Sequence, residues 1–184
     1  MRELVKENAA LIKTLPKNIA DDVTAYAARE AMKGRRVSDI ANEIRRMFPE
    51  RTRARAELIA RTQVSMTQTN LVQARAEGLG LNWYIWRACG GKQGDGRTRN
   101  SHRHMSGVLV RWNDPSAPED LFPIHRTDGK PYNNKLGNYH AGCCPNCRCY
   151  SEPVVDIDVL DWPMRVHQNG TIERVTRKQF ERMI

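Results

Sequence analysis

The sequence lacks the features of membrane and secreted proteins. No apolar run approaches the roughly 20 residues that a membrane-spanning helix needs. The first residues, MRELVKENAALIK, alternate charged with apolar side chains and have no signal-peptide core, which predicts a cytosolic product without a membrane partner. Aromatic residues make up only 7% of the 184 residues, and the mean hydropathy is −0.67. These values allow one core of ordinary size together with an elongated or polar part.

Cysteine is scarce and unevenly distributed. The chain has five cysteines, and four of them lie between residues 143 and 149. An odd number gathered at one point does not form the disulfide framework of a secreted domain. In a reducing compartment, such a cluster favours a metal site or a set of buried thiols.

Acidic residues are too few to balance the basic ones. Lys and Arg total 30 against 21 Asp and Glu, which gives a net charge of +9. This surplus favours a nucleic acid or an acidic protein as a partner. Many of the basic residues lie in a helical stretch, whose exposed side is either a nucleic-acid interface or simply a solvated face. The candidates for phosphate contact are Lys33, Arg35, Arg36, Arg45, Arg46, Arg51, Arg53 and Arg55.

The chain changes character near residue 80. Residues 1–80 read as a helical stem, with helices predicted at 16–34, at 38–48 with Ser38 as the N-cap, and at 52–77. Residues 81–184 read as a small α+β domain with long loops. Strands are predicted at 82–87, 107–112 and 147–155, followed by a hairpin at 165–176 and a short closing helix. The predicted fold class is therefore α+β, with a mixed or antiparallel sheet after the stem.

The segment CCPNCRC gives the sharpest chemical signal. Cys144 and Cys147 form a C-P-x-C turn that directs two sulfurs at one point. On a strand, Cys147 and Cys149 would share a face. A four-ligand zinc site needs two further ligands, and the thiols otherwise serve as core packing. The candidates for those ligands are Cys149, Cys143, His140, His102 and His104.

A second group of polar residues lies between residues 95 and 104. An Asp and two His within ten residues suit metal-assisted hydrolysis, and they equally suit a hydrogen-bonded turn. A nuclease would use His102 or His104 as the general base and hold a metal with Asp95 and His140. The alternative is a purely structural role for Asp95 and its neighbours.

Several segments together carry a family resemblance. They are a helical ARAELIARTQ segment, a WYIWR strand, the turn DGRTRNSHRHMSG, and C-R-C before SEPVV. In this combination the chain resembles the Mu F-like minor head proteins of tailed phages, also called head morphogenesis proteins, over residues 15–155. The matching framework positions are Arg61, Thr62, Asn70, Asp95, Arg97, His102, Gly107, Cys147, Arg148 and Cys149.

The resemblance implies a structural role rather than catalysis. Members are low-copy virion proteins inside the head near the portal vertex, and they occupy the host cytoplasm during assembly. The implied partners are the portal protein, the major capsid or scaffold proteins, and packaged DNA bound without sequence preference. The stem, residues 1–80, would then face the portal and the DNA.

Two departures from the family pattern bear on the metal. Gln63 stands where members often carry Glu, and Thr98 and His102 occupy the region of a C-x-x-C. If those cysteines complete a zinc site with C-R-C, this chain would use His102, or Cys143 and Cys144, instead. The competing hypotheses are a metal-dependent nuclease, testable by plasmid nicking, and a zinc-stapled nucleic-acid-binding module, testable by the salt dependence of binding.

Overall fold

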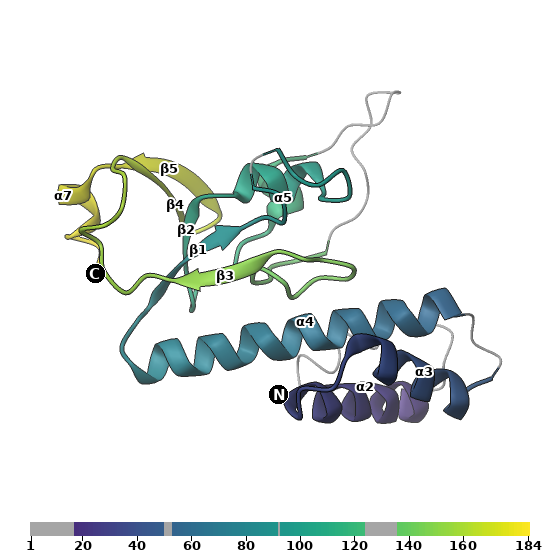
Figure 1. Ribbon diagram of the computed structural model, residues 1–184. Helices are drawn as coiled ribbons and strands as arrows, with labels where there is room; N and C mark the ends of the chain where they lie inside the picture. The colour runs from purple at the N-terminus through teal and green to yellow at the C-terminus, as the bar shows by residue number, and fades with distance from the viewer. Residues whose placement is uncertain (1–16, 50–52, 92, 124–135) are drawn as a thin grey trace, which may run out of the picture. The chain divides into compact units, whose positions relative to one another are not determined.

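The computed structural model describes residues 17–49, 53–91, 93–123 and 136–184 (Figure 1). The chain divides into two compact units, Met1–Gln68 and Thr69–Ile184. The division falls inside one helix, so the last turns of that helix belong to the second unit. Among the described residues, no helix has both the length and the apolar character needed to span a membrane.

The first unit is helical. It contains α2 (Lys17–Met32), α3 (Val37–Met47) and the first part of α4 (Arg53–Gly78). These bounds lie close to those predicted from the apolar periodicity and the flanking Gly and Pro residues. Small alanine side chains at the contacts let the helices approach one another closely. The buried core of this unit consists of Val23, Ala27, Ile40, Ala41, Ile44, Ala56, Ile59 and Ala60.

The predicted N-cap of α3 is wrong. The residue that flanks the helix is Arg36, which makes no side-chain capping hydrogen bond. Ser38 lies inside the first turn, where its hydroxyl is 3.4 Å from the Asp39 carboxylate. The helix instead depends on its apolar face, on which Ile40 and Ile44 are almost completely buried.

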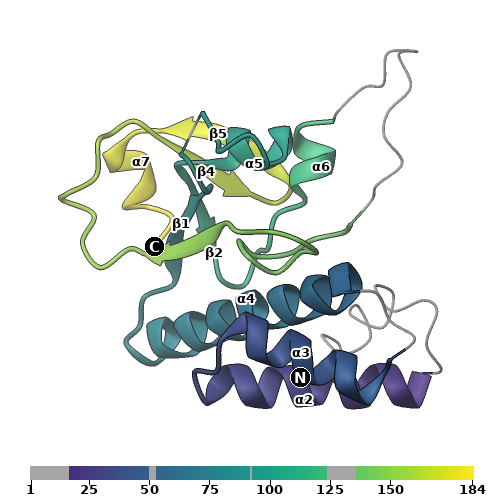
Figure 2. The ribbon, with the colours of Figure 1, turned by 45° about the vertical axis from the view of Figure 1, so that its right-hand side comes forward.

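A five-stranded mixed sheet organises the second unit, which confirms the α+β class (Figures 1 and 2). The order is β3-β1-β2-β4-β5, and all neighbours are antiparallel except β2 and β4. Asn169 and Gly170, with φ of 49° and 78°, close the predicted hairpin between β4 and β5. The strands are β1 (Trp83–Arg87), β2 (Val108–Arg111), β3 (Tyr150–Pro153), β4 (Met164–Gln168) and β5 (Thr171–Val175).

Both faces of this sheet are covered. Side chains alternate along β1, so Tyr84 and Trp86 enter one core while Trp83 and Ile85 enter the other. The last turns of α4 contribute Ala76 to the first core. The second core is closed by Phe180 of α7 (Arg177–Phe180). A strand buried on both faces explains why the WYIWR segment is almost continuously apolar.

Two short helices occupy segments that sequence reasoning assigned to loops. They are α5 (Asn100–Met105) and α6 (Pro118–Leu121). Both are too short for apolar periodicity to reveal them. Helix α5 matters most for the site, because it buries Met105 in the first core and fixes the position of His102.

Candidate metal centre

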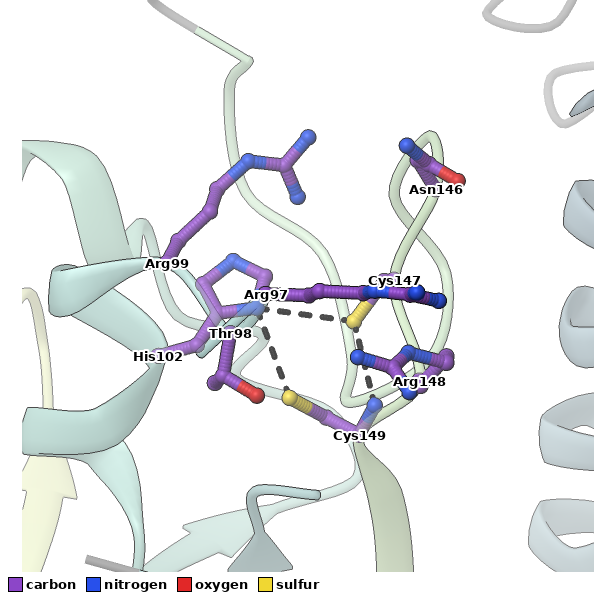
Figure 3. A pocket seen from close by; sticks show the side chains of 8 residues that line it. All are labelled: Arg97, Thr98, Arg99, His102, Asn146, Cys147, Arg148 and Cys149. Carbon is purple, nitrogen blue, oxygen red and sulfur yellow. Dashed lines mark hydrogen bonds between the residues drawn. The ribbon is translucent and has the colours of Figure 1, made fainter. Parts of the chain in front are cut away.

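Three cysteines and a histidine converge at one edge of the first core, and Figure 3 shows His102 with two of these cysteines, Cys147 and Cys149. The Cys149 and Cys147 sulfurs lie 3.4 and 3.5 Å from His102 Nδ1. The Cys144 sulfur lies 3.8 Å from His102 Nε2. One donor atom each from His102, Cys144 and Cys147 lies within 4.8 Å of the others. All four side chains are buried.

The cysteines come from a turn rather than from a strand. The prediction that Cys147 and Cys149 share a strand face is wrong, because β3 begins only at Tyr150. The Cys147 amide donates to the Cys144 carbonyl at 3.2 Å, and Asn146 takes a left-handed φ of 58°. The Cys149 amide also points at the Cys147 sulfur, 3.4 Å away. The turn therefore gathers the sulfurs without strand geometry.

A hydrogen-bonded pair holds Nε2 of the histidine ring, which also lies 3.8 Å from the Cys144 sulfur. The Tyr139 hydroxyl lies 2.9 Å from His102 Nε2 and donates to the Glu119 carboxylate at 2.6 Å. The other Glu119 oxygen is 3.4 Å from the same Nε2. With Nε2 engaged in this way, Nδ1 is the ring atom that faces Cys147 and Cys149. Sequence reasoning missed Glu119 and Tyr139, since no local pattern connects them to a histidine 17 to 37 positions away.

The contacts within the cluster favour ionisation of one thiol over the other two. Hydrogen bonds from Cys144 and Cys149 hold the pKa of the Cys147 thiol well below its usual value, and His102 acts in the same direction. The same bonds to Cys147 raise the pKa of both other thiols. Burial lowers the pKa of His102, but its contacts with Cys147 and Glu119 outweigh burial and raise it.

An arginine closes the outer side of the cluster. One guanidinium nitrogen of Arg99 donates a hydrogen bond to the Cys144 sulfur at 3.1 Å, and another donates to the Pro145 carbonyl at 2.8 Å. Hydrogen bonds of this kind stabilise thiolates, which are the ionic form that binds metals. Three thiolates and one imidazole are a donor set typical of structural zinc. In such sites the histidine nitrogen that does not bind the metal is hydrogen-bonded, as His102 Nε2 is here by Tyr139 and Glu119.

Other predicted ligands lie in different surroundings. Cys143 is half-buried and packs against the first core. The His140 ring packs against Trp112 with centroids 5.3 Å apart, and its Nδ1 lies 3.1 Å from the Tyr84 hydroxyl. The His104 ring stacks on Phe122 at 5.1 Å.

Asp95 organises a turn beside the cluster. Its carboxylate accepts from the Thr98 hydroxyl at 2.9 Å and from the Arg97 amide at 3.2 Å, and it pairs with Arg148. The Thr98 hydroxyl is the largest of the influences that lower the pKa of Asp95, so the carboxylate stays ionised. Of the four residues in the nuclease hypothesis, only His102 lies in the cysteine cluster, while Asp95, His104 and His140 have the separate surroundings given above.

The remaining framework positions have varied environments. Thr62 is buried, Arg61 is half-buried, and Asn70 is exposed on α4. Gly107 has a φ of 84° just before β2, and its amide donates to the Trp86 carbonyl at 2.8 Å. A left-handed φ at this position favours glycine.

Several basic residues of the helical unit are paired with acids. Lys33 and Arg35 both contact the buried Glu30, at 2.7 and 3.1 Å. Two further pairs, Arg46–Glu43 and Arg53–Glu57, lie along single helices. Arg36, Arg45 and Arg55 lie in or next to α3 and α4, and Arg51 is outside the described residues.

The fold and the site together define the class of protein. It is an α+β protein in which a cysteine–histidine cluster lies beside a small mixed sheet. The chain matches the family described as phage Mu protein F like protein over residues 18–152, and it belongs to that family. Family membership indicates a phage head morphogenesis protein.

One curated protein is also similar to this chain in sequence. An uncharacterized protein of Haemophilus influenzae strain Rd is 30% identical over 153 residues. The match covers 83% of this chain and 29% of that protein, so the chain spans less than a third of the relative's length. No solved structure matches the chain.

Proposed function

We propose that this protein is a structural minor head protein of a tailed phage, present in few copies in the virion. The observation that carries the proposal is the family match over residues 18–152, which includes both the helical unit and the cysteine–histidine cluster. In this role it associates with the portal vertex inside the head, next to the portal protein and the major capsid or scaffold proteins. Before assembly it occupies the host cytoplasm.

The proposal includes contact with packaged DNA. The net charge of +9 favours binding to concentrated phosphate through counterion release, which needs no base contacts. The basic side chains of the helical unit contribute to this contact. Binding should therefore weaken steeply with salt and depend little on DNA sequence.

The cysteine–histidine cluster holds zinc in this proposal, with Cys144, Cys147, Cys149 and His102 as the ligands. The support is the set of three thiols and one imidazole, together with the Tyr139 and Glu119 contacts to the histidine. Zinc bound there stabilises the small sheet, whose own core is limited. The role is structural, as four protein ligands leave no open position for a substrate.

The test of the virion role is quantitative mass spectrometry of purified particles, with the major capsid protein as the reference. A copy number far below that of the capsid protein supports the proposal. Absence from particles, while the protein is present in infected cells, would contradict it. Elemental analysis of the purified chain tests the cofactor separately, and we expect equimolar zinc that falls away in Cys147→Ser.

A further inference from the structure

A small polar hollow lies over the cysteine–histidine cluster (Figure 3). Its volume is about 110 Å³, which is room for several water molecules but not for a nucleoside. One side is formed by the segment that leads into α5, and the other by the turn that leads into β3. The lining residues are Arg97, Thr98, Arg99, His102, Asn146, Cys147, Arg148 and Cys149.

Three of these residues are arginines, and they come from two chain segments. Arg97 and Arg99 precede α5, while Arg148 lies between two cysteines of the turn. Arg99 is held by the Cys144 sulfur and the Pro145 carbonyl, and Arg148 is held by Asp95. Two guanidinium groups are thus fixed before any ligand arrives, which lowers the entropy cost of binding.

The charges around the hollow do not cancel. Three guanidinium groups line the hollow, and among the described residues no carboxylate lines it; Asp95 pairs with Arg148, and Glu119 lies against His102 Nε2. Zinc with three thiolates would add a single negative charge. The Arg97 side chain is exposed, and among the described residues no hydrogen bond or ion pair is found for its guanidinium group. The hollow therefore carries a positive excess beside an accessible arginine.

We propose that this hollow binds a phosphate group. Guanidinium groups form paired hydrogen bonds with the oxygens of carboxylates and phosphates. A tetrahedral oxyanion offers oxygens to donors that approach from both chain segments, whereas a planar carboxylate is matched by a single guanidinium. The phosphate is either a backbone group of nucleic acid or free phosphate. Since the hollow is too small for a base, recognition of a nucleic acid here ignores sequence.

This inference goes beyond the proposed function, because it concerns the purified chain and holds whether or not the protein enters virions. The principal variant is Arg97→Gln, which removes an exposed side chain. Arg182→Gln is the matched control, since it removes the same charge from another exposed position of the same unit. Arg97→Lys keeps the charge and loses the paired donors. Melting curves serve to check that all three variants fold.

Two probes separate the sources of the phosphate. Inorganic phosphate is titrated into the labelled protein while the amide resonances of Thr98 and Arg99 are followed by NMR. A short DNA duplex is titrated over a salt series while its fluorescence anisotropy is measured. We expect Arg97→Gln to weaken DNA binding about tenfold and to reduce the salt slope by about one, with Arg97→Lys intermediate and Arg182→Gln close to wild type.

Three combinations of the phosphate and DNA results decide whether the hollow binds phosphate. Saturable shifts with inorganic phosphate, together with a selective loss of DNA binding in Arg97→Gln, support the site and identify a nucleic-acid backbone as its ligand. Saturable shifts that Arg97→Gln abolishes, with unchanged DNA binding, support a site for free phosphate. Absence of shifts, combined with equal DNA affinity in Arg97→Gln and Arg182→Gln, overturns the proposal. The virion measurement is unaffected by any of these results.

Discussion

Acidification should expose the cost of partly burying His140 against the first core. The ring lies against Trp112 and beside the Tyr84 hydroxyl. Burial is the largest influence on this histidine and lowers its pKa from 6.5 to about 4, outweighing the opposing effect of the Trp112 backbone. The folded protein therefore keeps His140 neutral at a pH where the unfolded chain protonates it.

The sign and the size of the effect follow from proton linkage. Above pH 6.5 neither state protonates His140, so stability is unaffected. Between pH 6.5 and about 4 only the unfolded state takes up the proton, so the free energy of unfolding falls as the pH falls. One proton changes it by about 1.4 kcal/mol per pH unit, which gives about 3 kcal/mol over the whole range.

The assay is urea unfolding followed by tryptophan fluorescence. All four tryptophans lie in the second unit, so their signal reports the unit that contains His140. His140→Gln is the comparison variant, because an amide can still bond the Tyr84 hydroxyl but does not titrate. From pH 7.5 to pH 5, wild type should lose about 2 kcal/mol more than this variant. Curves that stay parallel to within about 0.5 kcal/mol would refute the reasoning.

Three further predictions concern the site and its supporting turn. Cys147→Ser should lower the melting temperature by several degrees and abolish zinc binding, as measured by calorimetry and elemental analysis; an unchanged melting curve would remove its structural role. Glu119→Gln should weaken zinc affinity about 10-fold to 100-fold in a chelator competition, while the exposed neighbour Asp120→Asn should not. Gly90→Ala should destabilise the fold more than Gly91→Ala, because both have positive φ but only a Cβ at Gly90 would collide with backbone, 2.4 Å from Gly94. Equal melting temperatures for the two alanine variants would contradict that steric argument.

Elements with local signals could be predicted from the sequence. Helix α3 has isoleucines spaced by four residues before Pro49, and the hairpin has Asn169–Gly170 between two alternating segments. Each signal lies within a few residues of the element that it specifies. Helix α5 has only six residues, most of them charged or polar, and its place depends on distant contacts. No periodicity in such a segment separates it from a loop.

The site was only partly predictable for the same reason. Four cysteines within seven residues predict a cluster, but their spacing does not show which of the sulfurs lie close together. Cys143 and Cys144 are adjacent, and yet the Cys144 sulfur lies 3.8 Å from His102 while Cys143 packs against the first core. The choice of His102 over His140 depends on how Tyr139 and Trp112 pack, which is decided across the sheet. Sequence spacing supplied the candidates, and tertiary contacts selected among them.

The cluster also bears on the stability of the second unit. His102 and Cys144 are 42 positions apart, and β2 and α6 lie between them. A metal that joins these two residues acts as a cross-link, and closing a loop of this length removes about 4 kcal/mol of chain entropy from the unfolded state in the simplest model. That amount is comparable to a large part of the stability of a small domain. If the proposed zinc is bound, its supply would then govern how much of the newly made chain is folded.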